Sequence, residues 1–287
     1  MSGSDEGARP QPAPVGSWQT VVTAREPVGP RAVLLTVLLP GRALPLAPGQ
    51  FVMARAWSAP DPLLRRPLAP FDVRVRADGT QLDLLVVAGG RGTRRIAALE
   101  PGATLDLLGP LGRGFGPLPA GRPVWLVGGG VGVAPLHHMV AELVRREEAE
   151  RLSRLHVVLG ARSGEALFGR EAFEAAGLPV LLATDRGDVG LRGTAIDALA
   201  QRLAHADDGS AIPYVYGCGP EPMLRALVAL CRERGWQGEV SVERYMACGF
   251  GVCFTCTCEV REPDRGRVHR VRSCLEGPVF PIERLAW

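Results

Sequence analysis

The chain has 287 residues, of which 46% are hydrophobic and 22% charged, and its formal net charge is +3. This length is enough for two or three domains, and the composition is ordinary for a soluble globular protein. The basic residues form no concentrated run, so a nucleic-acid-binding surface is not expected. No stretch reaches the ~18 apolar residues that a membrane-spanning helix needs.

The N-terminal segment is polar and rich in Pro and Gly. We expect residues 1–16 to form a disordered tail, because such a segment has too few apolar side chains to pack, and it lacks the apolar stretch of a signal peptide. Five of the seven cysteines gather between Cys248 and Cys274. A secreted disulfide scaffold would spread its cysteines along the chain. We therefore expect a cytoplasmic protein whose thiols bind a metal.

Residues 17–118 contain short apolar runs separated by Gly and Pro. In one of these runs apolar and charged side chains alternate, as they do in a half-exposed strand. A short helix is expected over Thr93–Leu99. Several strands at this spacing are typical of an antiparallel β-barrel. The predicted strands are Gln19–Ala24, Ala32–Leu39, Gln50–Ala56, Phe71–Arg76, Gln81–Ala88 and Thr104–Leu108.

Strands and helices alternate over residues 119–238, which is typical of a doubly wound parallel sheet. Residues 239–287 are too short and too rich in Gly and Cys for a core of their own, so a bound metal group would hold them together. The strands predicted in the α/β region are Pro123–Val127, Leu155–Leu159, Val180–Ala183 and Tyr214–Tyr216. The predicted helices are Pro135–Arg151, Gly169–Ala176, Thr194–Ala204 and Glu221–Arg234.

Two glycine-containing loops in the α/β region each follow a predicted strand and precede a predicted helix. Glycines let a backbone approach a pyrophosphate, and the start of a helix offers free N–H groups, so both loops indicate a dinucleotide site. Cys218 can then lie beside a nicotinamide ring. The alternative is a pair of tight turns without a ligand, with Cys218 a small buried side chain. The residues concerned are Gly128, Gly129, Gly130, Gly132, Cys218, Gly219 and Pro220.

Two further motifs lie in the strand-rich region. Arg66 is followed by Pro67 and can pair with a phosphate. The turn at Gly92 and Thr93 offers backbone and hydroxyl donors to a second phosphate. Arg66 and its neighbour Arg65 can also be ordinary solvated charges. Placed together in a barrel that precedes a nucleotide-binding sheet, the two motifs indicate a flavin.

Four cysteines, Cys248, Cys253, Cys256 and Cys274, have the C-x4-C-x2-C…C spacing of a plant-type [2Fe–2S] site. Four thiolates give each of two irons two ligands. The alternative is a structural zinc, but zinc ribbons favour two C-x2-C pairs and this chain has one. Cys258 could exchange roles with Cys256, although the x2 spacing favours Cys256 as the ligand.

The order of these motifs resembles the ferredoxin–NADP⁺ reductase superfamily over nearly the whole chain. More closely, it is similar to the electron-transfer subunits of class 1B dihydroorotate dehydrogenase, on the strength of Met-Ala-Cys-Gly at 246–249 and Gly-Pro-Val-Phe at 277–280. The resemblance implies an FAD-binding β-barrel, an NAD-binding parallel sheet and a small C-terminal [2Fe–2S] domain. It implies FAD contacts at Arg66, Pro67, Leu68, Ala69, Leu85, Val86, Val87, Gly92 and Thr93.

The chain departs from that family at two places. Ala69 stands where the family has a serine, and a lost hydroxyl weakens one flavin hydrogen bond by about 1 kcal/mol. The gap between Cys256 and Cys274 is long, and its polar insert, Arg261–Arg267, is expected to be a surface hairpin. Backbone contacts and Arg66 could still sustain FAD binding.

The resemblance implies that NADH passes a hydride to FAD, which releases electrons singly to the [2Fe–2S] cluster. The implied partner is an FMN-containing dihydroorotate dehydrogenase catalytic subunit, in a heterotetramer with two of each subunit. NADH and NADPH are not distinguished, since Arg162 and Arg186 are only possible contacts for a 2′-phosphate. The whole would be an electron-transfer subunit of an NAD-dependent oxidoreductase complex.

Two alternative functions compete with this hypothesis. The chain could be an NAD(P)H-dependent reductase subunit that serves a ferredoxin, a hydrogenase or a glutamate-synthase-like complex. Some of those relatives have a carboxylate in place of the first cysteine, so Cys248 favours the dihydroorotate-linked family. A zinc-stapled binding module would explain the cysteines, but it leaves the glycine loops and the Arg66–Pro67 segment unexplained.

Overall fold

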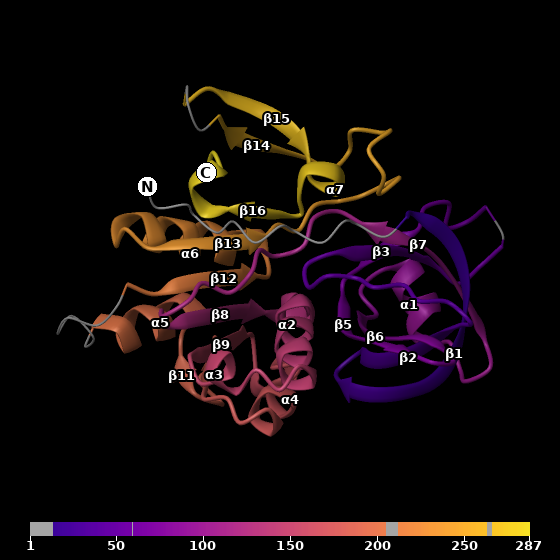
Figure 1. The fold of residues 1–287 in the computed structure, drawn as a ribbon, viewed down its shortest axis with the longest axis horizontal. Coiled ribbons are helices and arrows are strands. Elements are labelled where there is room, and N and C mark those ends of the chain that lie inside the picture. Colours follow the sequence, from indigo (N-terminus) through magenta and orange to yellow (C-terminus); the bar gives the residue numbers. More distant parts are fainter. Residues whose placement is uncertain (1–13, 59, 205–211, 263–265) are drawn as a thin grey trace.

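A computed structural model describes residues 14–58, 60–204, 212–262 and 266–287. Most of the expected N-terminal tail and the middle of the expected hairpin at Arg261–Arg267 lie outside these ranges. Figure 1 shows a curled antiparallel sheet on the right, a second sheet with its helices on the left, and a small C-terminal part across the top.

The first sheet has seven strands in the order β4-β3-β7-β1-β2-β6-β5, and each neighbouring pair is antiparallel. Its edge strands β4 and β5 are separated in the chain by Ala69 alone, so the sheet must curl until its edges approach each other. This is the expected barrel. Its elements are β1 (Gly16–Gly29), β2 (Ala32–Pro40), β3 (Phe51–Arg55), β4 (Arg66–Leu68), β5 (Pro70–Arg76), β6 (Gly79–Val87), α1 (Arg91–Ala97) and β7 (Thr104–Leu111).

Alternation along the barrel strands gives each strand an inner and an outer face. On β3, Val52 belongs to the barrel core, whereas Phe51 and Met53 pack outside it with two of the cysteines. On β6, Val86 belongs to the barrel core, whereas Leu85 packs against the α/β part. The outer surface of the barrel therefore has one apolar patch for each neighbouring part of the molecule.

The second sheet has the order β11-β10-β9-β8-β12-β13-β16, and only β16 is antiparallel to its neighbour. Helices α5 and α6 cover one face, and α2 and α4 cover the face toward the barrel. This is the expected doubly wound sheet. Its strands are β8 (Val124–Gly129), β9 (Leu155–Ala161), β10 (Val180–Thr184), β11 (Leu191–Arg192), β12 (Tyr214–Cys218), β13 (Gln237–Ser241) and β16 (Val279–Pro281). Its helices are α2 (Val133–Arg145), α3 (Ala149–Leu152), α4 (Arg170–Ala175), α5 (Ala195–Ala204) and α6 (Glu221–Glu233).

Two details of this sheet differ from the sequence-based expectation. The helix expected over Pro135–Arg151 is two helices, α2 and α3, and Glu147 between them has a left-handed φ of 56°. The expected domain end at residue 238 lies inside β13, and β16 returns from the C-terminal part to pair with it. The sheet therefore contains one strand that crosses the expected boundary and one strand from beyond it.

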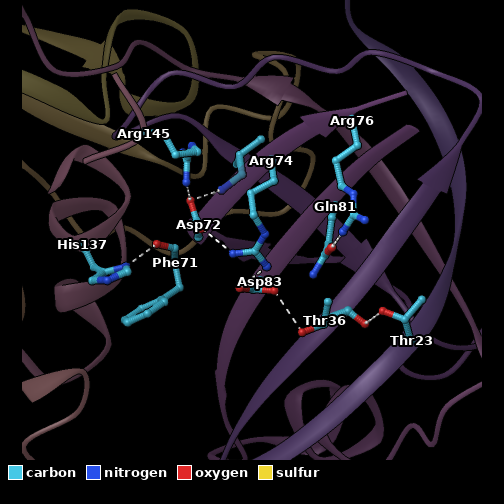
Figure 2. A network of polar contacts seen from close by, with 11 residues as sticks. Thr23, Thr36, Phe71, Asp72, Arg74, Arg76, Gln81, Asp83, His137 and Arg145 are labelled. Carbon is cyan, nitrogen blue, oxygen red and sulfur yellow. Dashed lines mark hydrogen bonds and ion pairs between the residues drawn. The ribbon is translucent and has the colours of Figure 1, made fainter. Parts of the chain in front are cut away.

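A polar network joins the barrel to α2 (Figure 2). Arg145 on α2 donates to the carboxylate of Asp72 on β5 at 2.7 Å, and Arg74 pairs with the same carboxylate. The ring nitrogen Nδ1 of His137 lies 2.9 Å from the carbonyl oxygen of Phe71, and the two rings stack. These contacts hold strand β5 of the barrel against helix α2 of the α/β part.

The C-terminal part consists of β14 (Thr257–Arg261), β15 (Val268–Arg272) and the short helix α7 (Ser273–Glu276). Cys258, Val260 and Val271 belong to the same buried cluster as Leu227 of α6. The C-terminal part therefore shares a core with the sheet, whereas the sequence led us to expect that a bound metal group would hold it together. Within the described ranges, no helix is both long and apolar enough to cross a membrane.

Candidate functional site

A cavity of about 330 Å³ lies where the barrel, the sheet and the C-terminal part meet. This volume falls within the range of roughly 300–1,000 Å³ that is typical of small-molecule sites. The barrel wall includes Gly49, Phe51, Pro67, Leu68, Ala69, Leu85, Val87 and Thr93. The other walls include Val131, Gly132, Ala134, Pro135, Cys218, Ser241, Val242, Glu243, Arg244, Met246 and Pro278.

Eight of the residues expected to bind cofactors share this cavity: Pro67, Leu68, Ala69, Leu85, Val87, Thr93, Gly132 and Cys218. Val86 does not line it, because its side chain is fully buried in the barrel core. The other residues expected to bind FAD or NAD(H) do not line the cavity. They are Arg66 and Gly92, which lie next to each other, and the remaining residues of the two glycine loops. The structure thus brings together residues from two domains that the sequence patterns placed at separate sites.

Arg66 lies across the first turn of α1. A Cβ atom on Gly92 would come within 2.5 Å of Arg66 Nε, so a residue with a side chain would displace the guanidinium. That guanidinium donates to the carbonyl of Leu64 and lies over the ring of Trp57. Thr93 Oγ1 accepts a hydrogen bond from the backbone N–H of Gly90. An arginine beside backbone N–H groups suits a phosphate.

Arg65, in contrast, is committed to the protein itself. It forms an ion pair with Asp106 at 2.7 Å and donates to the Asp106 carbonyl. Burial alone would raise the pKa of Asp106, but hydrogen bonds and charge from Arg65 and Arg55 outweigh it and lower that pKa. The two neighbouring arginines therefore have different surroundings: Arg65 is in an ion pair with Asp106, whereas Arg66 lies beside Gly92. The sequence alone left open whether either was more than a solvated charge.

The two glycine loops of the sheet pack backbone against backbone. A Cβ atom on Gly132 would lie 2.3 Å from the carbonyl oxygen of Cys218, and one on Gly219 would lie 3.1 Å from the backbone nitrogen of Gly129. Gly130 differs, because it has a φ of 54° and nothing lies within 4 Å of its Cβ position. The loop–loop contact thus explains Gly132 and Gly219, and Gly130 leaves an open approach at the start of α2.

Cys218 ends β12 at the cavity and is 5% exposed. Desolvation and the nearby Glu243 raise the pKa of its thiol, so the thiol is neutral at physiological pH. Glu243 is an exposed residue that lines the same cavity, and desolvation raises the pKa of its carboxyl group. Glu243 was not among the residues predicted to bind a cofactor. Its only signal was its place at the start of the segment that leads to Cys248.

The four spaced cysteines influence one another electrostatically. Cys253 interacts with Cys248, and Cys274 interacts with both Cys256 and Cys248. Hydrogen bonds from Thr255 and from Cys248 lower the pKa of Cys253 to about 6, whereas desolvation and Cys256 raise the pKa of Cys274 to about 12. Within the described ranges, no three Cys, His, Asp or Glu side chains converge on one metal-ion position. Four thiols are the ligand set of a two-iron cluster.

The loop around these thiols fits an iron–sulfur cluster in two further respects. Gly249 and Gly251 have φ values of 82° and 91°, which allow the backbone to wrap closely around a compact group. The hydroxyl of Ser273 is fully buried and has no hydrogen-bond partner among the described residues. Buried hydroxyl groups normally have a partner, and a cluster sulfur is an acceptor that would supply one.

The fold and the site define a reductase-type electron-transfer protein, with a flavin barrel, a nicotinamide sheet and an iron–sulfur segment. Family models match all three parts. Residues 19–115 match an oxidoreductase FAD-binding domain, and residues 126–229 match an oxidoreductase NAD-binding domain. Residues 243–286 match the iron–sulfur cluster binding domain of dihydroorotate dehydrogenase B.

Whole-chain comparisons identify the family. The chain is 40% identical over 239 residues to the dihydroorotate dehydrogenase B (NAD(+)) electron transfer subunit of Shouchella clausii, covering 82% of this chain and 85% of the relative. It is 35% identical to the subunit of the same name from Desulforamulus reducens, covering 91% and 94%. The chain therefore belongs to the family of dihydroorotate dehydrogenase B electron transfer subunits.

Solved structures show the same fold. An NADH-dependent reduced ferredoxin–NADP oxidoreductase superposes with a TM-score of 0.75 at 25% identity, covering 93% of this chain and 90% of that one. A cytochrome P450 reductase from Amycolatopsis superposes with a TM-score of 0.62 at 23% identity, covering 77% and 67%. The expected fold class, the family, and the cofactors FAD, NAD(H) and a [2Fe–2S] cluster are confirmed by these matches together.

Proposed function

We propose that this chain carries electrons between NAD(H) and an FMN-containing catalytic subunit that interconverts dihydroorotate and orotate. The observation that carries the proposal is the shared cavity, because one space is lined by the barrel, by the sheet and by the segment that leads to the cysteines. We further propose a cytoplasmic heterotetramer with two of each subunit. Both points extend what the names of the relatives say of those proteins.

FAD supplies the conversion between a two-electron hydride and single electrons, and the barrel residues would hold it in place. Arg66 and the N–H groups at Gly92 and Thr93 neutralise phosphate charge. The strand segments around Ala69 and Leu85 shape an apolar wall for the ring system and keep water away from it. The proposed FAD residues are Arg66, Pro67, Leu68, Ala69, Leu85, Val86, Val87, Gly92 and Thr93.

The sheet residues would bind and orient the nicotinamide nucleotide. The open approach at Gly130 lets a pyrophosphate reach the first turn of α2. The neutral thiol of Cys218 bounds the cavity without placing a negative charge beside it. Glu243, with its raised pKa, can hold or release a proton at its carboxyl oxygen. The proposed NAD(H) residues are Gly128, Gly129, Gly130, Gly132, Cys218, Gly219 and Pro220, and the proposed iron ligands are Cys248, Cys253, Cys256 and Cys274.

Coexpression with an FMN-containing dihydroorotate dehydrogenase from the same genome tests the proposal. We expect the two chains to copurify with FAD, FMN and two irons per copy of this chain. The complex should reduce NAD⁺ with dihydroorotate, and the catalytic subunit alone should not. Recovery of this chain as a colourless zinc protein, or failure to couple dihydroorotate to NAD⁺ in a fully loaded complex, would refute it.

A further inference from the structure

Two side chains belong both to the wall of the flavin cavity and to the surroundings of the cysteines. Phe51, at the start of β3, is 3% exposed; it lines the cavity and packs with Cys256 and Cys274. Met246, in the segment that leads to the cysteines, is half-buried; it also lines the cavity and packs against the same cluster. These two side chains therefore connect the cavity wall with the buried cluster that holds two of the thiols. We call Phe51 and Met246 the dividing wall.

The dividing wall is held from several sides. Gly112, directly after β7, lies close to both the Phe51 ring and Pro278. A Cβ atom on Gly112 would lie 2.8 Å from Phe51 Cε1 and 2.6 Å from Pro278 Cδ. Met53 lies two residues after Phe51 on β3 and points to the same outer face of the barrel. A Cβ atom on Gly249 would lie 2.4 Å from Met53 Cγ, so the cysteine loop comes close to this face. The cysteine loop is thus seated directly on this face of the barrel.

The four thiols are not equivalent with respect to the dividing wall. Cys256 and Cys274, which belong to the same buried cluster, are 2% and 1% exposed. Cys253 is exposed and Cys248 half-buried. Because Cys256 and Cys274 are buried while Cys248 and Cys253 are more exposed, a cluster held by all four would have a buried side and a more exposed side.

We infer that electrons pass between the flavin cavity and the cluster through Phe51 and Met246, and that an iron held by Cys256 and Cys274 would lie nearer the cavity than an iron held by Cys248 and Cys253. The inference rests on the proposed function and adds the route and its polarity. Each NADH that becomes NAD⁺ yields two electrons and a proton. In the direction of NADH oxidation, the two electrons would cross the dividing wall one at a time, because a [2Fe–2S] cluster accepts a single electron, and the proton would go to solvent. The FMN of the catalytic subunit would take up each electron before the next one crosses.

Fluorine NMR tests the placement of the wall without measuring activity. The chain has eight phenylalanines, which can be replaced biosynthetically by 4-fluorophenylalanine in the loaded protein. The Phe51→Leu variant assigns the Phe51 signal. We expect that signal to be broadened or shifted by the paramagnetic cluster and to move when FAD is removed. Phe173, fully buried in α4, should show no cluster broadening. A Phe51 signal that responds to only one of the two groups would overturn the inference.

Stopped-flow measurements test the route itself. In Phe51→Leu and in Met246→Ala, we expect NADH to bleach the flavin at the wild-type rate and the cluster to be reduced several-fold more slowly. The matched control is Phe173→Leu, which makes the same change at a fully buried ring away from the cavity. Met246 is only half-buried, so its variant remains informative if Phe51→Leu folds poorly.

The outcomes separate the inference from the proposed function. If the loaded wild-type protein reduces its cluster with NADH and both wall variants do so at the wild-type rate, the route is wrong and the function stands. If wild-type protein binds FAD and iron but NADH reduces neither, the function and the route both fail. FAD and iron contents are measured for every variant, so a slow rate is not mistaken for a missing cofactor.

Discussion

At the scale of single residues, Cys258 shows how packing partners can separate a structural thiol from a ligand, because it lies in a different buried cluster from Cys256 and Cys274. It lies on β14, is 3% exposed, and packs in the core that the C-terminal part shares with the sheet. We expect Cys258→Ala to keep the full iron content and to lose about 1 kcal/mol of unfolding free energy, since a small buried group is removed. Iron analysis and denaturant unfolding measure the two effects. Cys256→Ala is the matched control and should lose the cluster; loss of iron in Cys258→Ala would contradict the assignment.

Ala69 is a second residue with a defined consequence. It is half-buried at the junction of β4 and β5 and lines the cavity. A hydroxyl at this position can donate to the flavin, so we expect Ala69→Ser to strengthen FAD binding by about 1 kcal/mol, or roughly fivefold in Kd. Fluorescence titration of FAD-free protein measures the change. Ala69→Val adds bulk without a hydrogen-bonding group and should not tighten binding. Equal affinity in Ala69→Ser and the parent would argue against a donor role for this position.

At the scale of elements, the polar network in Figure 2 holds β5 against α2. Burial alone would raise the pKa of Asp72, but Arg145 and Arg74 outweigh it and lower that pKa. A carboxyl group with a lowered folded-state pKa stabilises the fold above its unfolded pKa, near 4, and loses that contribution as the pH falls. We expect Asp72→Asn to cost on the order of 2 kcal/mol at neutral pH. The difference from the parent should shrink in acid.

Urea unfolding at a series of pH values measures this dependence. The control is Asp78→Asn, because Asp78 also pairs with an arginine of β5, Arg76, but both side chains are more than half exposed. Exposed ion pairs contribute little, so this control should change stability only slightly at any pH. A cost for Asp72→Asn that is constant from neutral pH down to pH ~3 would show that charge is not the source of the stabilisation.

Local patterns predicted most elements, and the exceptions have a tertiary cause. β13 was missed because Glu239 sits in its centre, and a charged residue there weakens the strand pattern. In the fold Glu239 is 5% exposed and accepts a hydrogen bond from the backbone N–H of Gly116 at 2.6 Å. The cysteine spacing was visible in the sequence. The contact of Phe51 with those cysteines was not, because it joins segments about two hundred residues apart.

At the scale of the whole molecule, the C-terminal part is held in two independent ways. The loop over residues 248–256 depends on the spaced cysteines, whereas β16 pairs with β13 through Val240 and Phe280, both fully buried. Removal of iron should therefore loosen the loop and leave the sheet intact, because the strand pairing involves no thiol. We expect hydrogen exchange to accelerate over 248–256 after anaerobic chelation, with β13, β16 and α2 unchanged. Faster exchange in β13, β16 and α2 would contradict this expectation. It would mean that the cluster is needed to hold the barrel against the sheet and that the polar network at Asp72 is too weak to do so alone.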